Sequence, residues 1–174
     1  YNIRFIDVGI VFAVSTSKRD VEIVFHFNTI VDVETDSLGI DHIYLKEWLS
    51  KITIRNKKNE LINKKTGKKI SAIIPVNIFG HPCRIKELLA VAEQFNLPVL
   101  EDASESLGSF IGDNHTGTLG RLGVISFNGN KIITSGGGGA ILTNDEKLAS
   151  KVRHLSTTAK LPHKWDFIHD EVGY

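Results

Sequence analysis

The chain has 174 residues, enough for one domain with a substantial buried core. Its 21 basic and 20 acidic residues nearly balance, so the overall charge gives no reason to expect a nucleic-acid or membrane partner. Cys83 is the single cysteine, which excludes an internal disulfide and a four-cysteine zinc site, and no metal site is predicted. The cysteine usage fits a reducing, cytoplasmic setting. No apolar run reaches the length of a membrane span.

Residues 1–35 are rich in Val, Ile, Phe and Thr. Residues 8–12 and 21–25 are predicted strands separated by a polar turn, and residues 29–33 are a third candidate. Asp41 is then placed to cap a helix over residues 42–51. Because the chain begins at Tyr1 and contains no methionine, we expect it to be a piece of a longer protein.

Residues 53–70 are strongly basic and are predicted to form a solvated loop. The cationic residues are Arg55, Lys57, Lys58, Lys64, Lys65, Lys68 and Lys69. A nucleic-acid site over residues 55–69 is the alternative, but no aromatic residue is interleaved for base stacking.

A βαβ pattern begins at residue 71. Residues 71–76 form a short apolar run typical of a strand buried on both faces. An amphipathic helix follows, with apolar positions Ile85, Leu88, Leu89, Ala92 and Phe95, and Asn96 and Pro98 end it. Residues 98–100 then predict a strand that leads into Glu101 and Asp102. Such a unit indicates a right-handed crossover in a parallel sheet, where sites lie at the carboxyl ends of strands.

Two further strands are predicted at residues 124–127 and 140–143. Asn144 is predicted to cap a third helix, whose first turn is acidic and whose last turns are basic, as the helix dipole favours. Residues after Ser156 indicate a loop.

Lys131 is the first candidate for chemistry, because it follows a predicted strand and precedes the four glycines at 136–139. A pyridoxal phosphate enzyme needs a lysine that forms a Schiff base, a carboxylate for the pyridine nitrogen, and hydroxyls for the phosphate. Lys131, Asp102 and Ser126 could fill these roles. Taken singly, each signal has a simpler explanation: Lys131 as a solvated lysine, Asp102 as the cap of a turn, and the four glycines as a flexible loop.

Four blocks in order carry a resemblance over residues 73–174. They are residues 75–82 (PVNIFGHP), 101–109 (EDASESLGS), 115–120 (HTGTLG) and 126–131 (SFNGNK) with the glycines that follow. Together they resemble the DegT/DnrJ/EryC1/StrS family of nucleotide-sugar aminotransferases. Residues 155–160 and 169–174 are most similar to the branch that aminates C4 of nucleotide-linked 4-keto-6-deoxy sugars, in legionaminic or bacillosamine-type synthesis.

The resemblance implies an α/β fold. It would be part of an aspartate-aminotransferase-like (fold type I) large domain, a mostly parallel sheet flanked by helices, with one partial domain over residues 1–174. It also implies that the first part of that domain, with its phosphate-binding loop, and the small C-terminal domain are missing, and residues 10–28 depart from the family pattern.

By position, the resemblance makes Lys131 the Schiff-base lysine and Asp102 the partner of the pyridine nitrogen. Ser126 would bind the phosphate of pyridoxal 5′-phosphate, and Glu105 would lie near the cofactor's 3-oxygen, where many relatives have glutamine. The lysine favours transamination, because family members that dehydrate sugars have histidine there.

The implied function is transfer of an amino group, with glutamate as the expected donor, to C4 of a nucleotide-linked 4-keto-6-deoxy sugar by a homodimer. The second hypothesis is a catalytically inactive fragment that acts only in a larger assembly. Exposed apolar surface and aggregation are also expected.

Overall fold

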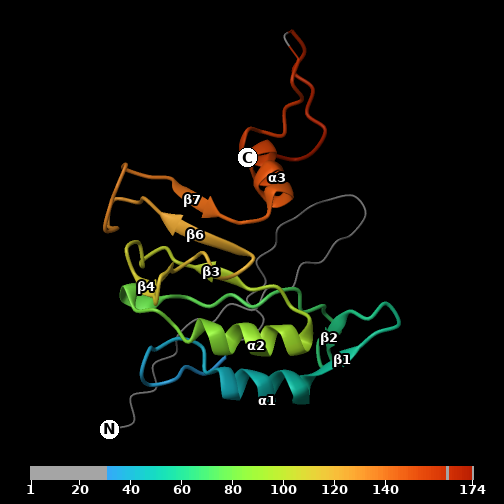
Figure 1. Cartoon of the computed structure of the whole chain (residues 1–174). Helices are drawn as coiled ribbons and strands as arrows, with labels where there is room; N and C mark the ends of the chain where they lie inside the picture. Colours follow the sequence, from blue (N-terminus) through green and yellow to red (C-terminus); the bar gives the residue numbers. More distant parts are fainter. Residues whose placement is uncertain (1–30, 164, 174) are drawn as a thin grey trace.

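The computed structural model describes residues 31–163 and 165–173 (Figure 1). The strands predicted at residues 8–12 and 21–25, the first two residues of the one at 29–33, and the divergent residues 10–28 lie outside this range. Of the described residues 31–33, only Val33 pairs, through an isolated bridge to Ile40.

The main sheet has the order β3-β6-β7. Strand β3 (Leu100–Asp102) runs parallel to β6 (Leu122–Ser126), and β6 runs antiparallel to β7 (Gly139–Leu142). On the other side of β3, residues 73–76 run parallel to it through the bridges Ile73 to Val99 and Val76 to Asp102. The apolar run predicted as a strand is therefore buried beside β3, although it pairs only through isolated bridges.

Helix α2 (Ile85–Phe95) connects residues 73–76 to β3, which confirms the predicted βαβ order. It buries the face formed by Ile85, Leu88, Val91 and Ala92, and it ends where Asn96 adopts a left-handed conformation. Figure 1 shows α2 between the sheet and α1 (His42–Ile52). The predicted cap of α1 is confirmed, because Asp41 accepts hydrogen bonds from the N–H groups of Ile43 and Tyr44 at 2.8 and 3.0 Å.

Helix α3 spans Glu146–Ser156. The prediction that Asn144 caps it is wrong, because the Asp145 side chain accepts the N–H groups of Lys147 and Leu148 at 2.9 and 3.1 Å. An N-cap side chain reaches the N–H groups two and three residues later, so a shift of one residue in the helix start moves the cap from Asn144 to Asp145.

The loop predicted at residues 53–70 is a β-hairpin. Strands β1 (Thr53–Arg55) and β2 (Leu61–Asn63) pair antiparallel, so the loop interpretation is wrong for these six residues. Thr53 and Leu61 are buried and anchor the hairpin, whereas Lys57, Lys58 and Lys65 are exposed as expected. A second small hairpin joins β4 (Phe110–Ile111) and β5 (Asn114–His115).

The hydrophobic core lies between α1, α2 and the residues beside β3. Its most buried members are Val31, Ile40, Leu45, Leu49, Ile73, Ile85, Leu88 and Val99. In the described part of the chain, no helix is both long and apolar enough to cross a bilayer.

Cys83 belongs to this core, and its thiol is expected to be unreactive in the folded chain. Burial, with a smaller contribution from Glu101, raises the pKa of the Cys83 thiol from 9.0 to about 12. Since the thiolate is the reactive form, we expect thiol labelling at pH 8 to be slower in the native chain than in guanidinium by about 100-fold or more. Ellman's reagent measures both rates, and equal rates would contradict the buried position.

Candidate active site

The carboxyl ends of the parallel strands bring the predicted residues to one edge of the sheet. Asp102 ends β3, Ser126 ends β6, and the register places Asp102 opposite Val124, two residues before Ser126. Asn77 follows the bridged residue Val76 at the same edge. The sequence therefore places three polar side chains where parallel sheets carry their sites.

Lys131 lies in the connection between β6 and β7. Its N–H donates to the carbonyl of Asn128 at 3.0 Å, which forms a tight turn after β6. Phe127 pairs with Gly138 and Ser135 across this connection, so the glycines fold back over the turn. Gly136 and Gly138 have φ of 84° and 86°, a conformation that favours glycine.

The Lys131 amine contacts Glu105. Its Nζ lies 3.1 Å from Glu105 Oε1, and the lysine side chain is only 18% exposed. The other oxygen, Oε2, accepts the N–H of Phe79 at 3.0 Å. The bond from Lys131 contributes most, and the bond from Phe79 adds to it. Together they hold the pKa of the Glu105 carboxyl below its usual 4.5, so Glu105 is ionised at neutral pH.

Asp102 is fixed by its backbone. Its N–H donates to Pro75 at 2.8 Å, its carbonyl accepts from Asn77 at 3.0 Å, and its carboxylate accepts the N–H of Ser104 at 3.0 Å. Ser126 Oγ accepts the N–H of Asn128 at 3.3 Å. Among the described residues, the structure pairs Lys131 with Glu105, whereas Asp102 and Ser126 make local contacts at the same sheet edge.

No role was assigned from the sequence to two residues near the ends of these strands. Glu101 is 1% exposed and accepts three backbone N–H groups, from Gly117, Leu119 and Gly120, at 2.6 to 2.8 Å. Phe79 is 87% exposed and adopts φ 52°, which is unusual for a bulky residue. A signal existed for Glu101, because strand alternation turns it away from the face that Asp102 occupies.

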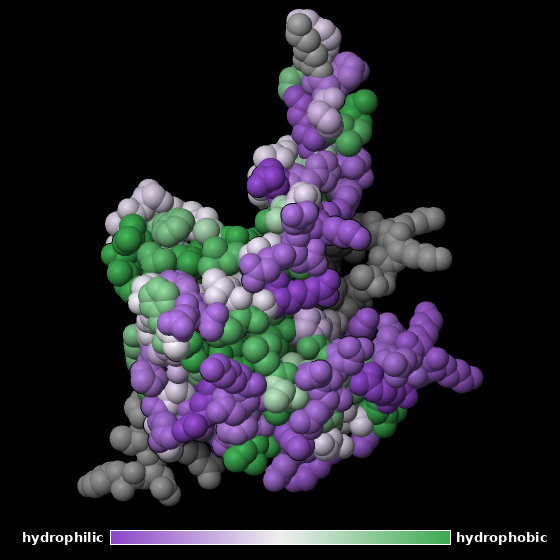
Figure 2. All heavy atoms as spheres, in the orientation of Figure 1, coloured by the Kyte–Doolittle hydropathy of each residue, from purple (hydrophilic) through white to green (hydrophobic). Residues whose placement is uncertain are grey.

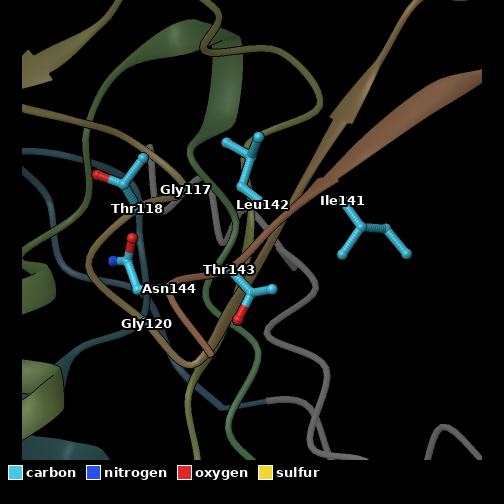
Figure 3. A pocket seen from close by; sticks show the side chains of 7 residues that line it. All are labelled: Gly117, Thr118, Gly120, Ile141, Leu142, Thr143 and Asn144. Carbon is cyan, nitrogen blue, oxygen red and sulfur yellow. The ribbon is translucent and has the colours of Figure 1, made fainter. Parts of the chain in front are cut away.

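A pocket elsewhere on the sheet does not include these residues. It is lined by Gly117, Thr118, Gly120, Ile141, Leu142, Thr143 and Asn144 (Figure 3). Leu142 pairs with Gly123 near the start of β6, whereas Gly139 pairs with Ser126 at its end. The pocket therefore lies at the opposite end of β6 from Ser126.

Apolar side chains are exposed beside the candidate site. Figure 2 shows them gathered over the part of the face where β6, β7 and their connection lie. They include Val124, Ile132, Ile133 and Ile141, which are between 41% and 66% exposed. A contiguous apolar surface of this kind marks an interface or an aggregation-prone face.

The described α/β domain shares its fold with fold type I aminotransferases of known structure. A crystal structure of a DegT DnrJ EryC1 StrS aminotransferase from Brucella abortus superposes with a TM-score of 0.69 at 29% identity, covering 83% of this chain and 36% of that one. The DegT/DnrJ/EryC1/StrS aminotransferase family matches residues 29–174, and the chain belongs to it.

Two curated relatives show the same pattern. "Putative pyridoxal phosphate-dependent aminotransferase EpsN" of Bacillus subtilis is 40% identical over 111 residues, which is 64% of this chain and 28% of the relative. GDP-perosamine synthase of Escherichia coli O157:H7 is 37% identical over 113 residues, which is 65% of this chain and 31% of the relative. The chain thus spans about three tenths of these relatives.

Proposed function

We propose that this chain carries part of the active site of a pyridoxal phosphate-dependent aminotransferase. The observation that carries the proposal is the shielded Lys131 amine paired with Glu105, at the edge where Asp102 and Ser126 end adjacent parallel strands. These residues suit the cofactor chemically: an amine for its aldehyde, a carboxylate for its ring nitrogen and a hydroxyl for its phosphate. When bound, the cofactor supplies an electron sink for the substrate carbon.

Each residue has a separate proposed role. Lys131 would bind the cofactor and move the proton at the substrate carbon. Asp102, held by its backbone bonds, would keep the ring nitrogen protonated. Ser126 would donate to the phosphate, and Glu105 would lie near the 3-oxygen.

The proposed substrate is a nucleotide-linked 4-keto-6-deoxy sugar aminated at C4, with glutamate as donor. Support comes from the family and from the relative named as a GDP-perosamine synthase. The exposed apolar face over β6 and β7 supports a homodimer in the complete protein. The alternative is that this part of the protein is inactive without the remaining seven tenths of its relatives' length.

Binding of pyridoxal 5′-phosphate to the chain tests the proposal. We expect wild type to develop the absorption band of lysine-bound cofactor, and borohydride followed by peptide mapping to place the label on Lys131. Lys131→Ala should lose the band completely. Lys69→Ala is the matched control, because Lys69 also pairs with a glutamate, Glu60, at 3.0 Å. No band in wild type would favour the inactive alternative, and a band that persists in Lys131→Ala would refute the role of that lysine.

A further inference from the structure

The turn at Phe79 is held in an unfavourable conformation next to the candidate lysine. Phe79 lies in the short helical turn η1 (Ile78–Gly80) with φ 52° and ψ 23°, and its ring is exposed to solvent. A bulky residue in this left-handed region costs free energy and persists only where surrounding contacts enforce it. The contacts that hold this conformation therefore show which residues the turn depends on.

Residues 105–109 supply those contacts. Glu105 Oε2 accepts the N–H of Phe79 at 3.0 Å, and the Ser109 hydroxyl donates to the carbonyl of Gly80 at 2.6 Å. Gly80 itself has φ 79°, and a Cβ there would meet the Glu105 carbonyl at 2.9 Å. The turn is thus packed tightly against the segment that begins with Glu105.

The same carboxylate holds the lysine. Glu105 Oε1 lies 3.1 Å from Lys131 Nζ, and twenty-six residues separate Glu105 from each of its two partners along the chain. Two bonds orient a carboxylate better than one, because turning the carboxylate toward solvent breaks both bonds. Each bond therefore supports the other.

We propose that Glu105 is a positioning residue that couples the Lys131 amine to the Phe79 turn. The inference rests on the proposed function, in which a carbonyl compound takes up the amine of Lys131 with loss of water. When that happens a C=N bond replaces the carbonyl C=O bond, and two of the three nitrogen protons leave in the released water. The nitrogen then has at most one N–H for Glu105, so that contact is weakened while the bond from Phe79 remains. The turn is then less firmly held, so the conformational stability of the Phe79 turn depends on whether the Lys131 amine is free or bonded to a carbonyl compound.

Amide hydrogen exchange at Phe79, measured by NMR without any added ligand, tests the coupling. Glu105→Ala removes the acceptor, and we expect exchange at Phe79 to accelerate by about tenfold. Lys131→Met leaves the acceptor but removes its second partner, and about threefold acceleration is expected for a pair of this exposure. The double variant should match Glu105→Ala alone, because the lysine acts only through the carboxylate.

Lys69→Met is the control for loss of an ion pair, and it should leave Phe79 unchanged. Unchanged exchange at Phe79 in Lys131→Met, or additive effects in the double variant, would overturn the coupling. Added pyridoxal 5′-phosphate should accelerate exchange in wild type as Lys131→Met does. If exchange responds to Lys131→Met but the cofactor does not bind, the proposed function fails and the coupling stands.

Discussion

Glu101→Ala is expected to lower the free energy of unfolding by about 4 kcal/mol, because three backbone N–H groups lose their shared acceptor. The Glu101 carboxylate is buried and accepts from Gly117 at 2.8 Å, Leu119 at 2.7 Å and Gly120 at 2.6 Å. These bonds tie the loop at 117–120 to β3. Denaturant unfolding followed by circular dichroism measures the change.

Two further variants separate the loss of these hydrogen bonds from the general effect of replacing a glutamate. Glu101→Gln keeps one oxygen for Leu119 and Gly120 but turns an amide donor toward Gly117, so about half the loss is expected. Glu93→Ala, on the exposed side of α2, should change stability by at most about 0.5 kcal/mol. Equal stability of Glu101→Ala and Glu93→Ala would show that water replaces Glu101 as the acceptor for the N–H groups of the 117–120 loop.

The helices were predictable because their signals are local. An apolar period of 3.6 residues located α2, and Asp41 located the start of α1, since a cap acts within three residues. The hairpin of β1 and β2 was not found. Each strand has only three residues, too few for an alternation, and the lysines around them are typical of a solvated loop.

The residues of the candidate site likewise divide into those that local sequence indicates and those that it does not. Lys131, Asp102 and Ser126 could be proposed because each follows or ends a strand. Glu105 was found only through the family resemblance, and its contact with Lys131 depends on a turn twenty-six residues away.

Glu101 and Phe79 were missed for related physical reasons. The partners of Glu101 return to it sixteen to nineteen residues later. The left-handed conformation at Phe79 is imposed by tertiary contacts, and no glycine or asparagine at that position signals it.

Gly123→Ala is expected to destabilise the chain by about 3 kcal/mol, at the upper end for overpacking. Gly123 lies in β6 between two paired neighbours, Glu101 on β3 and Leu142 on β7. A Cβ at this position would meet the backbone of Gly117, including its C and Cα atoms at 2.6 Å. The obstacle is backbone rather than a flexible side chain, so the loop must move to make room.

Gly129→Ala is the matched control. Nothing lies within 4 Å of a Cβ there, and we expect a change of at most about 0.5 kcal/mol in the same unfolding experiment. Displacing Gly117 also disturbs its bond to Glu101, so Gly123→Ala and Glu101→Ala should be less than additive when combined. Full additivity would show that the glycine contact and the carboxylate stabilise the loop independently. A combined effect that falls short of the sum by about 1 kcal/mol or more would establish that β3, β6 and this loop form one packed unit.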